Sequence, residues 1–255
     1  MNTKVIEIWK IARIIVLAML IFGSIGLVEK KYAERICSAI KVDIDNQFEN
    51  YFINEGDIID LITNGGENRI VGESFDNLKL KAIEKELLDT KFIQNAEVYK
   101  DLEGNLMISI NQSRPIARLM SKKMNDRYVS NKGEVLPLSK RYTARVVLID
   151  GSYANNAKLY DLMKSEYDRQ LMDLLKYIDK DKFWKAQIAQ LNIDRKGNIK
   201  MYTQVSKQVV EFGEPVDIAE KFMKLKVFYK DILPAKGWNN YNRVSVKFKD
   251  QIVCE

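Results

Sequence analysis

The stretch that decides the first part of the fold is residues 93–112, IQNAEVYKDLEGNLMISINQ. It divides into Ile93–Asp101 and Leu106–Gln112, which lie on either side of Glu103-Gly104-Asn105. Gly104 supplies the positive φ that a tight hairpin turn requires. The stretch therefore predicts two strands that pair as a β-hairpin.

The residues before this hairpin predict one more strand and two helices. In Ala39–Asp45, apolar side chains alternate with charged ones, and a period of two is typical of a half-buried strand. Apolar side chains share one helical face in Glu55–Thr63 and again in Asn77–Thr90, and Asn64-Gly65-Gly66 ends the first helix. The order β-α-α-β-β predicts a small α+β domain in which two helices cover one face of a three-stranded sheet.

The residues after the hairpin predict a second, larger domain. Pro115 cannot donate a hydrogen bond to a strand ladder, so Arg114-Pro115 is placed at the border between the two domains. Amphipathic helices are expected over a stretch that contains Leu159 and Ile178 and over one that begins at Pro215. Strands are expected at Ile116–Met120, Arg127–Ser130, Glu134–Leu138, Arg145–Asp150, Trp184–Asp194, Ile199–Thr203, Gln208–Phe212 and Tyr241–Val253. This pattern predicts an antiparallel β-sheet with two helices.

The N-terminus carries an uncharged run, Ile14–Val28, that follows a basic tail. A helix that begins at Ile8 and ends with this run is roughly 31 Å long, close to the roughly 30 Å thickness of a hydrocarbon core. The run therefore predicts a single transmembrane helix at 9–28, after a cytoplasmic tail at 1–8 and before a stalk at 29–36.

A cleaved signal peptide is the alternative interpretation of this run, because Ser24 and Gly26 fit the small-residue positions before a cleavage site. We favour an uncleaved anchor, since apolar Leu27 and Val28 follow Gly26 and no Ala-x-Ala motif is present. The positive charges on the two sides of the run are nearly balanced, so charge alone does not fix the orientation.

Composition excludes several classes of function. The 255 residues carry a net charge of +6, half of which lies in the first 35 residues, so the remainder is too weakly basic to bind nucleic acid through phosphate contacts. The absence of histidine removes the Ser-His-Asp and Cys-His pairs and the histidine-ligated zinc sites. Cys37 and Cys254 form no CxxC motif, and whether they pair in a disulfide is left open. No metal, cofactor or small-molecule substrate is expected.

Acid–base catalysis by carboxylates is the remaining enzymatic hypothesis. Solvated strand faces and helix ends explain the paired aspartates without catalysis, and no phosphate-binding loop or nucleophile motif accompanies them. A membrane-anchored periplasmic hydrolase of cell-wall glycan is nevertheless kept as the alternative function. The pairs are Asp43 with Asp45, Asp57 with Asp60, and Asp179 with Asp181.

Three motifs carry a resemblance to a known family. The first is Phe92–Val98 with Leu106–Ile110 and Arg114-Pro115-Ile116-Ala117, the second is Tyr128–Pro137, and the third is Phe212-Gly213-Glu214-Pro215 with Lys221–Leu225 and Tyr229. In this order they resemble, respectively, the end of the POTRA domain, the turn that opens the second domain, and the late strand-to-helix corner of the FtsQ/DivIB family of bacterial division proteins. The Cys254 end is similar to the Bacteroidetes-type branch of that family.

The resemblance implies a POTRA-like domain at 37–113, a C-terminal β domain at 114–255 and no enzymatic activity. It implies a scaffold at the division septum, held in the inner membrane with its bulk in the periplasm, that links early and late division proteins. Other membrane-bound division proteins are expected to bind the POTRA-like domain. FtsB-like and FtsL-like partners are expected to bind the C-terminal strand.

The strand expected to bind these partners is Tyr241–Val253, with Val244, Val246 and Phe248 on its buried face. As the last strand it is expected at the edge of the sheet, where unpaired backbone groups accept an incoming strand. The alternative is that Lys247 and Lys249 repel such pairing, as edge lysines often do. The residues expected to contact the partners are Trp238, Tyr241, Arg243, Ser245 and Lys247.

Overall fold

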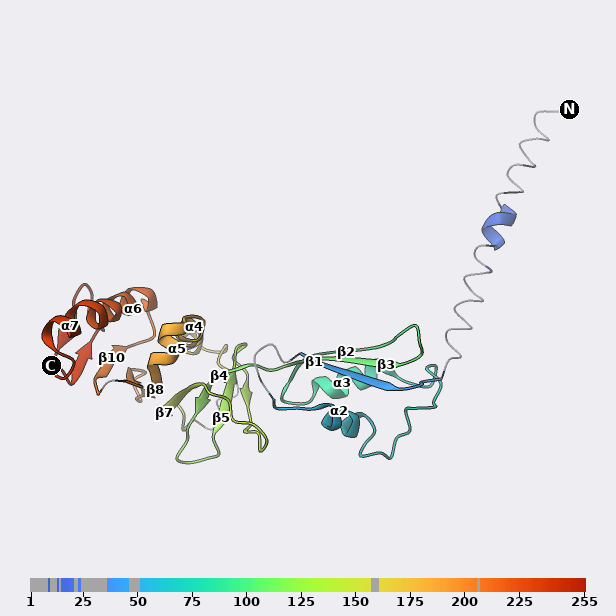
Figure 1. The fold of residues 1–255 in the computed structure, drawn as a ribbon, viewed down its shortest axis with the longest axis horizontal. Helices are drawn as coiled ribbons and strands as arrows, with labels where there is room; N and C mark the ends of the chain where they lie inside the picture. The colour runs from blue at the N-terminus through green and yellow to red at the C-terminus, as the bar shows by residue number, and fades with distance from the viewer. Residues whose placement is uncertain are drawn as a thin grey trace. The chain divides into compact units, whose positions relative to one another are not determined.

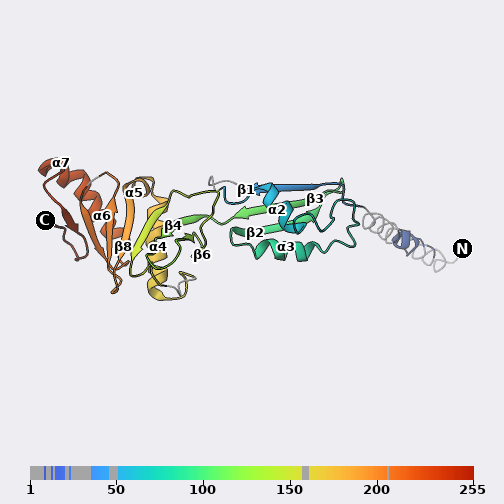
Figure 2. The same ribbon diagram turned by 90° about the horizontal axis from the view of Figure 1, so that it is seen from below.

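The computed structural model describes residues 9, 13, 15–20, 23, 36–45, 51–156, 161–205 and 207–255, drawn as ribbons in Figures 1 and 2. These residues divide into two compact units: one runs to Asp45 and resumes over Ile53–Gln112, and the other comprises Tyr51, Phe52 and Ser113–Glu255. Within the described part of the chain, no helix combines the length and the hydropathy of a membrane span. The anchor predicted at 9–28 falls largely outside the described residues.

The first unit has the predicted order β-α-α-β-β. Its strands lie in the order β1-β3-β2, with β1 parallel and β2 antiparallel to β3. Figure 1 shows α2 and α3 on the same side of this sheet. The elements are β1 (Ile40–Asp45), α2 (Glu55–Ile62), α3 (Leu80–Leu88), β2 (Ile93–Lys100) and β3 (Leu106–Gln112).

Local sequence explains these elements. Helix α2 begins at Glu55 because Asn54 and Asp57 form a capping box, in which each side chain accepts a hydrogen bond from the other residue's backbone N–H. The helix then turns Ile58 and Ile62 into the core. The helix predicted at Asn77–Thr90 is shorter in the structure, where only Leu80–Leu88 (α3) is helical.

The second unit is built on a nine-stranded sheet in the order β12-β11-β10-β9-β8-β7-β4-β5-β6. Helices of this unit lie against the strands (Figure 2). The strands are β4 (Pro115–Leu119), β5 (Arg127–Ser130), β6 (Val135–Leu136), β7 (Val147–Gly151), β8 (Ile188–Ile193), β9 (Ile199–Thr203), β10 (Val209–Gly213), β11 (Arg243–Ser245) and β12 (Val253–Cys254). The helices are α4 (Glu166–Lys180), α5 (Lys182–Gln187), α6 (Ile218–Val227), the π-helix η1 (Phe228–Ile232) and α7 (Leu233–Lys236).

The prediction of an antiparallel sheet is wrong. The sheet is mixed, since β4 with β7, β7 with β8, and β10 with β11 are parallel pairs. Helices connect β7 to β8 and β10 to β11, and a helical crossover lets the chain enter the next strand in the same direction. The helical connections thus account for two of the three parallel pairs, whereas β4 and β7 are connected through β5, β6 and a loop.

The strand predicted at Trp184–Asp194 begins later than expected, because Lys182–Gln187 forms the helix α5. The Asp181 carboxylate accepts hydrogen bonds from the backbone N–H groups of Phe183 and Trp184, at 2.8 and 3.2 Å. This cap satisfies the first turn of a helix, so the strand begins only at Ile188.

Two further helix boundaries differ from the prediction. Helix α4 begins at Glu166 rather than near Leu159, because the Ser165 side chain accepts a hydrogen bond from a backbone N–H in its first turn. Helix α6 begins at Ile218 rather than Pro215, because Asp217 has a left-handed backbone with φ of 51°. In both cases apolar residues at helical spacing are also present before the helix. The N-cap residues, Ser165 and Asp217, decide where each helix starts.

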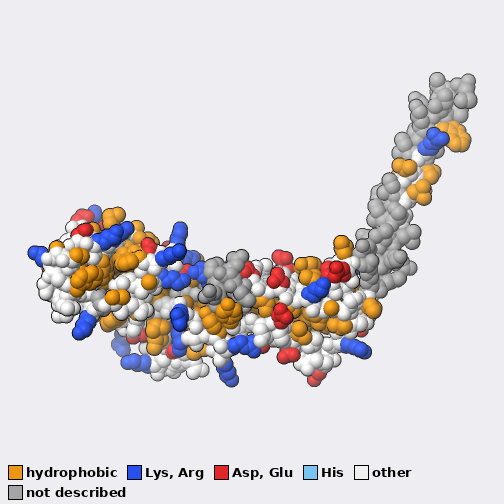
Figure 3. All heavy atoms as spheres, viewed as in Figure 1, with side chains coloured by type: hydrophobic (Ala, Val, Ile, Leu, Met, Phe, Trp, Pro, Cys, Tyr) orange, Lys and Arg blue, Asp and Glu red, His pale blue; other side chains and the backbone are white. Residues whose placement is uncertain are grey.

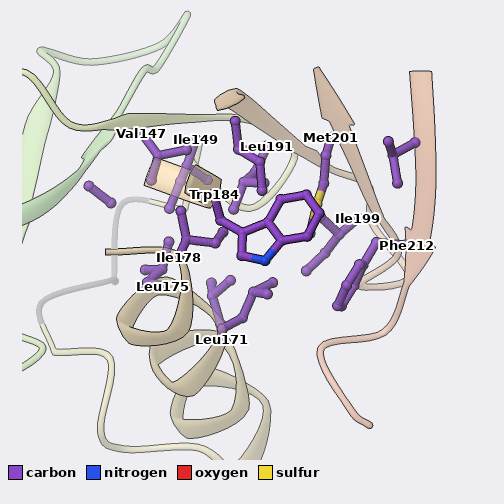
Figure 4. Packing of buried hydrophobic residues seen from close by; sticks show 14 of the residues in the cluster. Val147, Ile149, Leu171, Leu175, Ile178, Trp184, Leu191, Ile199, Met201 and Phe212 are labelled. Atoms are coloured by element: carbon purple, nitrogen blue, oxygen red, sulfur yellow. The ribbon is translucent and has the colours of Figure 1, made fainter. Parts of the chain in front are cut away.

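The core of the second unit surrounds Trp184, whose side chain is only 4% exposed. Its ring centroid lies 4.8 Å from that of Phe222 and 6.3 Å from that of Tyr229. Figure 4 shows the indole above Leu171 and beneath the strands of the sheet. A residue of α5 therefore holds α4, α6 and the sheet together.

The third family-like motif has a structural role. Gly213 has φ of 75°, and a Cβ placed there would lie 3.0 Å from the Cβ of Lys247. The buried Lys221 donates a hydrogen bond from Nζ to the Glu214 carbonyl at 2.8 Å and lies 4.8 Å from the Phe212 ring centroid. Burial lowers the pKa of this lysine. The motif fixes the corner between β10 and α6.

Both cysteines are free thiols in this structure. Cys37 is fully buried in the first unit, and Cys254 lies half-buried in β12. Burial raises the pKa of each thiol, so neither is activated as a nucleophile at neutral pH.

Candidate partner-binding site

The C-terminal strand differs from the prediction in its extent and in its place in the sheet. The expected strand Tyr241–Val253 is two short strands, β11 and β12, because the chain turns between them, where Asp250 has φ of 55°. Strand β11 pairs with β10 on one side and with β12 on the other, so β12 is the edge strand.

The backbone of Cys254 faces outward from this edge. Arg243 and Glu255 exchange two backbone hydrogen bonds, of 3.0 and 2.9 Å. In an antiparallel ladder, hydrogen-bonded and non-hydrogen-bonded pairs alternate, so the neighbouring pair of Val244 and Cys254 is not hydrogen-bonded. The N–H and C=O of Cys254 therefore point away from β11, in the direction from which another strand could pair.

The opposite edge of the sheet, β6, is partly covered. Glu134, immediately before β6, forms an antiparallel bridge with Asp161, and the Leu162 N–H donates a hydrogen bond to the Gly133 carbonyl at 2.8 Å. Strand pairing from outside is therefore easier at β12 than at β6.

Two of the predicted contact residues meet at a carboxylate of β10. Arg243 Nη1 lies 3.3 Å from Glu211 Oε1, and Lys247 Nζ lies 3.4 Å from Glu211 Oε2. Arg243 also forms an ion pair of 2.7 Å with Glu255. Burial alone would raise the pKa of Glu211, but the hydrogen bonds from the two cations outweigh it and lower the pKa. Glu211 thus holds both cations beside the edge strand.

The cationic character of this site is local. On the face drawn in Figure 3, lysine and arginine side chains are scattered among acidic and uncharged ones rather than aligned in one stripe. Arg243 and Lys247 are both exposed to solvent.

The other predicted contact residues lie in different surroundings. Ser245 is buried, and its Oγ has no hydrogen-bond partner among the described residues. Tyr241 is half-buried, with its ring centroid 6.2 Å from that of Phe228. Trp238 is 52% exposed in the loop after α7, where its carbonyl accepts a hydrogen bond from Gln208. Only Arg243 and Lys247 are brought together by the structure.

The predicted burial of Val244, Val246 and Phe248 on one face holds as far as Val246. Val244 and Val246 are fully buried as predicted, whereas Phe248 is 44% exposed because it follows β11 and no longer obeys the strand alternation. The Val246 N–H donates to the Glu211 carbonyl, so the N–H of the preceding Ser245 faces β12. A proline at Ser245 would therefore break the sheet itself rather than an outward contact.

The paired aspartates have structural positions. Asp43 and Asp45 are exposed on β1, and Asp60 is exposed on α2. Asp57 and Asp181 cap helices, and Asp179 is ion-paired with both Arg114 and Lys185. The exposed members lie on the surface, and Asp57, Asp179 and Asp181 accept hydrogen bonds or form ion pairs within the protein.

Sequence reasoning missed Glu211, Glu255 and the outward backbone of Cys254. Glu211 lies in the middle of a predicted strand, where a charge between apolar neighbours indicated a polar face. The last strand was expected at the edge, but nothing in the sequence indicated that this edge is a separate strand, β12, because a two-residue strand is too short to show alternation.

The two units define a class of protein, one in which a POTRA-like domain precedes a larger mixed-sheet domain. Residues 35–111 match the family model of the POTRA-like domain, and residues 114–255 match that described as "FtsQ/DivIB, C-terminal related". The chain therefore belongs to the FtsQ/DivIB family, whose domains are those of a cell division scaffold rather than of an enzyme. A search of curated proteins found no match.

Proposed function

We propose that this chain is a non-enzymatic, membrane-anchored scaffold that links early and late division proteins at the septum. It binds FtsB-like and FtsL-like partners in the periplasm through the edge strand β12. The observation that carries this proposal is the outward-facing backbone of Cys254 at the less covered end of the nine-stranded sheet. A partner segment adds a strand there by backbone hydrogen bonds, a mode that needs a free edge and no catalytic group.

Side chains beside the edge give this docking its specificity. Arg243 and Lys247 attract acidic side chains of the partner, since both are exposed and lie on one side of β11. Tyr241 and Trp238 supply aromatic contact area. Ser245, being buried, acts by holding β11 in the sheet rather than by touching the partner.

The first domain, 37–113, receives other membrane-bound division proteins, and the second, 114–255, carries the edge-strand site. The proposed anchor at 9–28 leaves 1–8 in the cytoplasm and the remainder in the periplasm. A reporter that works only in the periplasm, fused after Glu255, tests this topology. Activity of a cytoplasm-only reporter at the same position would contradict it.

Depletion of the chain in its own cells tests the division role. Filamentous cells without septa are expected, and rescue by the full chain but not by one that ends at Ile252 is expected, because the shortened chain lacks β12. Normally spaced septa after depletion would refute the scaffold proposal.

The alternative, a hydrolase of cell-wall glycan, makes a different prediction. The purified full chain incubated with peptidoglycan is expected to release no soluble fragments. Release that disappears on substitution of a single aspartate would instead support the hydrolase.

A further inference from the structure

A cavity of about 440 Å³ lies in the second unit, and its lining includes no residue of β11 or β12. Residues from α5, from the loop after β9, from the helical stretch α6–η1 and from the loop after α7 line it. Four of its lining residues are aromatic: Phe183, Trp184, Tyr229 and Trp238. A cavity of this size and composition accommodates one or two large apolar side chains.

Aromatic side chains at this cavity are exposed to an unusual degree. Trp184 and Tyr229 are buried, but Phe183 and Trp238 are each 52% exposed, and Val205 beside them is 80% exposed. Large apolar side chains that gather at the mouth of a cavity mark binding surfaces, and tryptophan is among the residues that contribute most to binding energy.

One of the lining residues, Tyr229, carries an unsatisfied polar group. The hydroxyl of Tyr229 is buried and has no hydrogen-bond partner among the described residues. A buried hydroxyl without a partner is unfavourable, so its presence needs an explanation. Tyr229 lies in the π-helix η1, a rare local geometry that frequently occurs at functional sites.

The charge around the cavity is positive. Lys226 and Lys230 line it, and neither takes part in any ion pair among the described residues. The acidic group among the lining residues is Asp181, whose carboxylate already accepts the two backbone N–H groups that begin α5. Two uncompensated cations therefore remain for a ligand.

We propose that this cavity binds an acidic peptide segment of a partner protein, at a site that shares Trp238 with the proposed edge-strand docking but has no lining residue in β11 or β12. An aromatic or large aliphatic side chain of the segment enters beside Trp184 and Trp238. Flanking aspartate or glutamate residues reach Lys226 and Lys230. A peptide fits better than a glycan, because a sugar needs many uncharged polar contacts and the lining offers few besides Gln187.

The test uses the purified full chain and an array of short peptides in which one tryptophan, phenylalanine or leucine is flanked by aspartate and glutamate, by glycine, or by lysine. The acidic peptides are expected to bind best. Trp238→Ala, and Lys226→Glu combined with Lys230→Glu, are expected to weaken the best binder about tenfold or more. The double lysine variant is the one specific to the cavity, because Trp238 is also a proposed contact of the edge-strand docking. Circular dichroism checks that each variant is folded.

Two controls give the test its specificity. Lys236→Glu changes an exposed lysine of α7 that does not line the cavity, and it is expected to leave peptide binding unchanged. Cys254→Pro alters the sheet edge and is likewise expected to leave peptide binding unchanged, so failure at this site and failure of the edge-strand proposal are distinguishable. Soluble peptidoglycan fragments are measured in parallel.

Three results would overturn the inference: no acidic peptide binds, neutral or basic peptides bind equally well, or the cavity variants bind as the wild type does. Binding of peptidoglycan fragments that is lost in Trp238→Ala, without binding of acidic peptides, would replace the peptide with a glycan as the ligand.

Discussion

Replacement of Cys254 by proline tests the edge-strand docking most directly. The Cys254 N–H points away from β11, so proline removes a donor that faces the incoming strand and leaves the ladder between Arg243 and Glu255 intact. Edge strands tolerate proline, so the chain is expected to fold. The partner's carbonyl that should accept this N–H is left without a donor, at a cost of about 1–3 kcal/mol. The Kd is therefore expected to rise about 5- to 150-fold.

The assay is a titration of the purified full chain with the FtsB-like and FtsL-like pair. The matched control is Cys254→Ala, which removes the thiol but keeps the backbone N–H, and its Kd is expected to stay within about twofold of the wild type. Thermal unfolding of both variants checks that the sheet is intact. Equal binding by Cys254→Pro and Cys254→Ala would show that partners do not pair with this edge.

Three other substitutions or deletions are predicted to have defined effects. Because the Glu211 pKa is lowered in the fold, its ion pairs stabilise the protein above about pH 4 and are lost as the pH falls below that value. Glu211→Gln is expected to reduce the free energy of unfolding at pH 7 by about 0.5–1 kcal/mol and to flatten its decline in acid, measured by urea denaturation between pH 7 and 3. An unchanged acid profile would refute this role. Gly213→Ala is expected to cost about 1–2 kcal/mol, seen as a lower Tm, because alanine disfavours φ of 75°. An unchanged Tm would contradict it. Deletion of residues 37–113 with the N-terminal segment retained is expected to abolish recruitment to midcell in fluorescence microscopy, and normal localisation would count against a recruiting role for that domain.

Much of the first unit was predictable, because its signals are local. The alternation in Ala39–Asp45 and the hairpin glycine at Gly104 needed no distant contacts, and β1, β2 and β3 are confirmed within one or two residues. The capping box of α2 joins Asn54 and Asp57, which are close in sequence. The predicted start of α2 at Glu55 is confirmed. Local hydrogen bonding and side-chain periodicity decide such elements, and both can be read from the sequence.

The N-terminal boundary of α4 was predicted wrongly, although the sequence contains a local signal for it. Ser165 stands three residues before Asp168, a spacing typical of a helix N-terminus, and it marks the start of α4. Leu162, which lies before this cap, is fully buried all the same, so its apolar character indicated burial and not helix. Hydrophobic spacing alone does not separate a helix from a buried loop that leads into it.

By itself, the sequence determined the two-part organisation, the local elements of the first unit and the family, because these depend on neighbouring residues and on short motifs. Only the tertiary structure decided that the large sheet is mixed, that β12 rather than the whole of Tyr241–Val253 forms its edge, and that Arg243 and Lys247 meet at Glu211. It also placed Trp238 beside Trp184 around one cavity. Strand order, the ion pairs at Glu211 and the grouping of Trp238 with Trp184 all depend on contacts between residues far apart in the chain. Periodicity carries no information about which distant segments become neighbours.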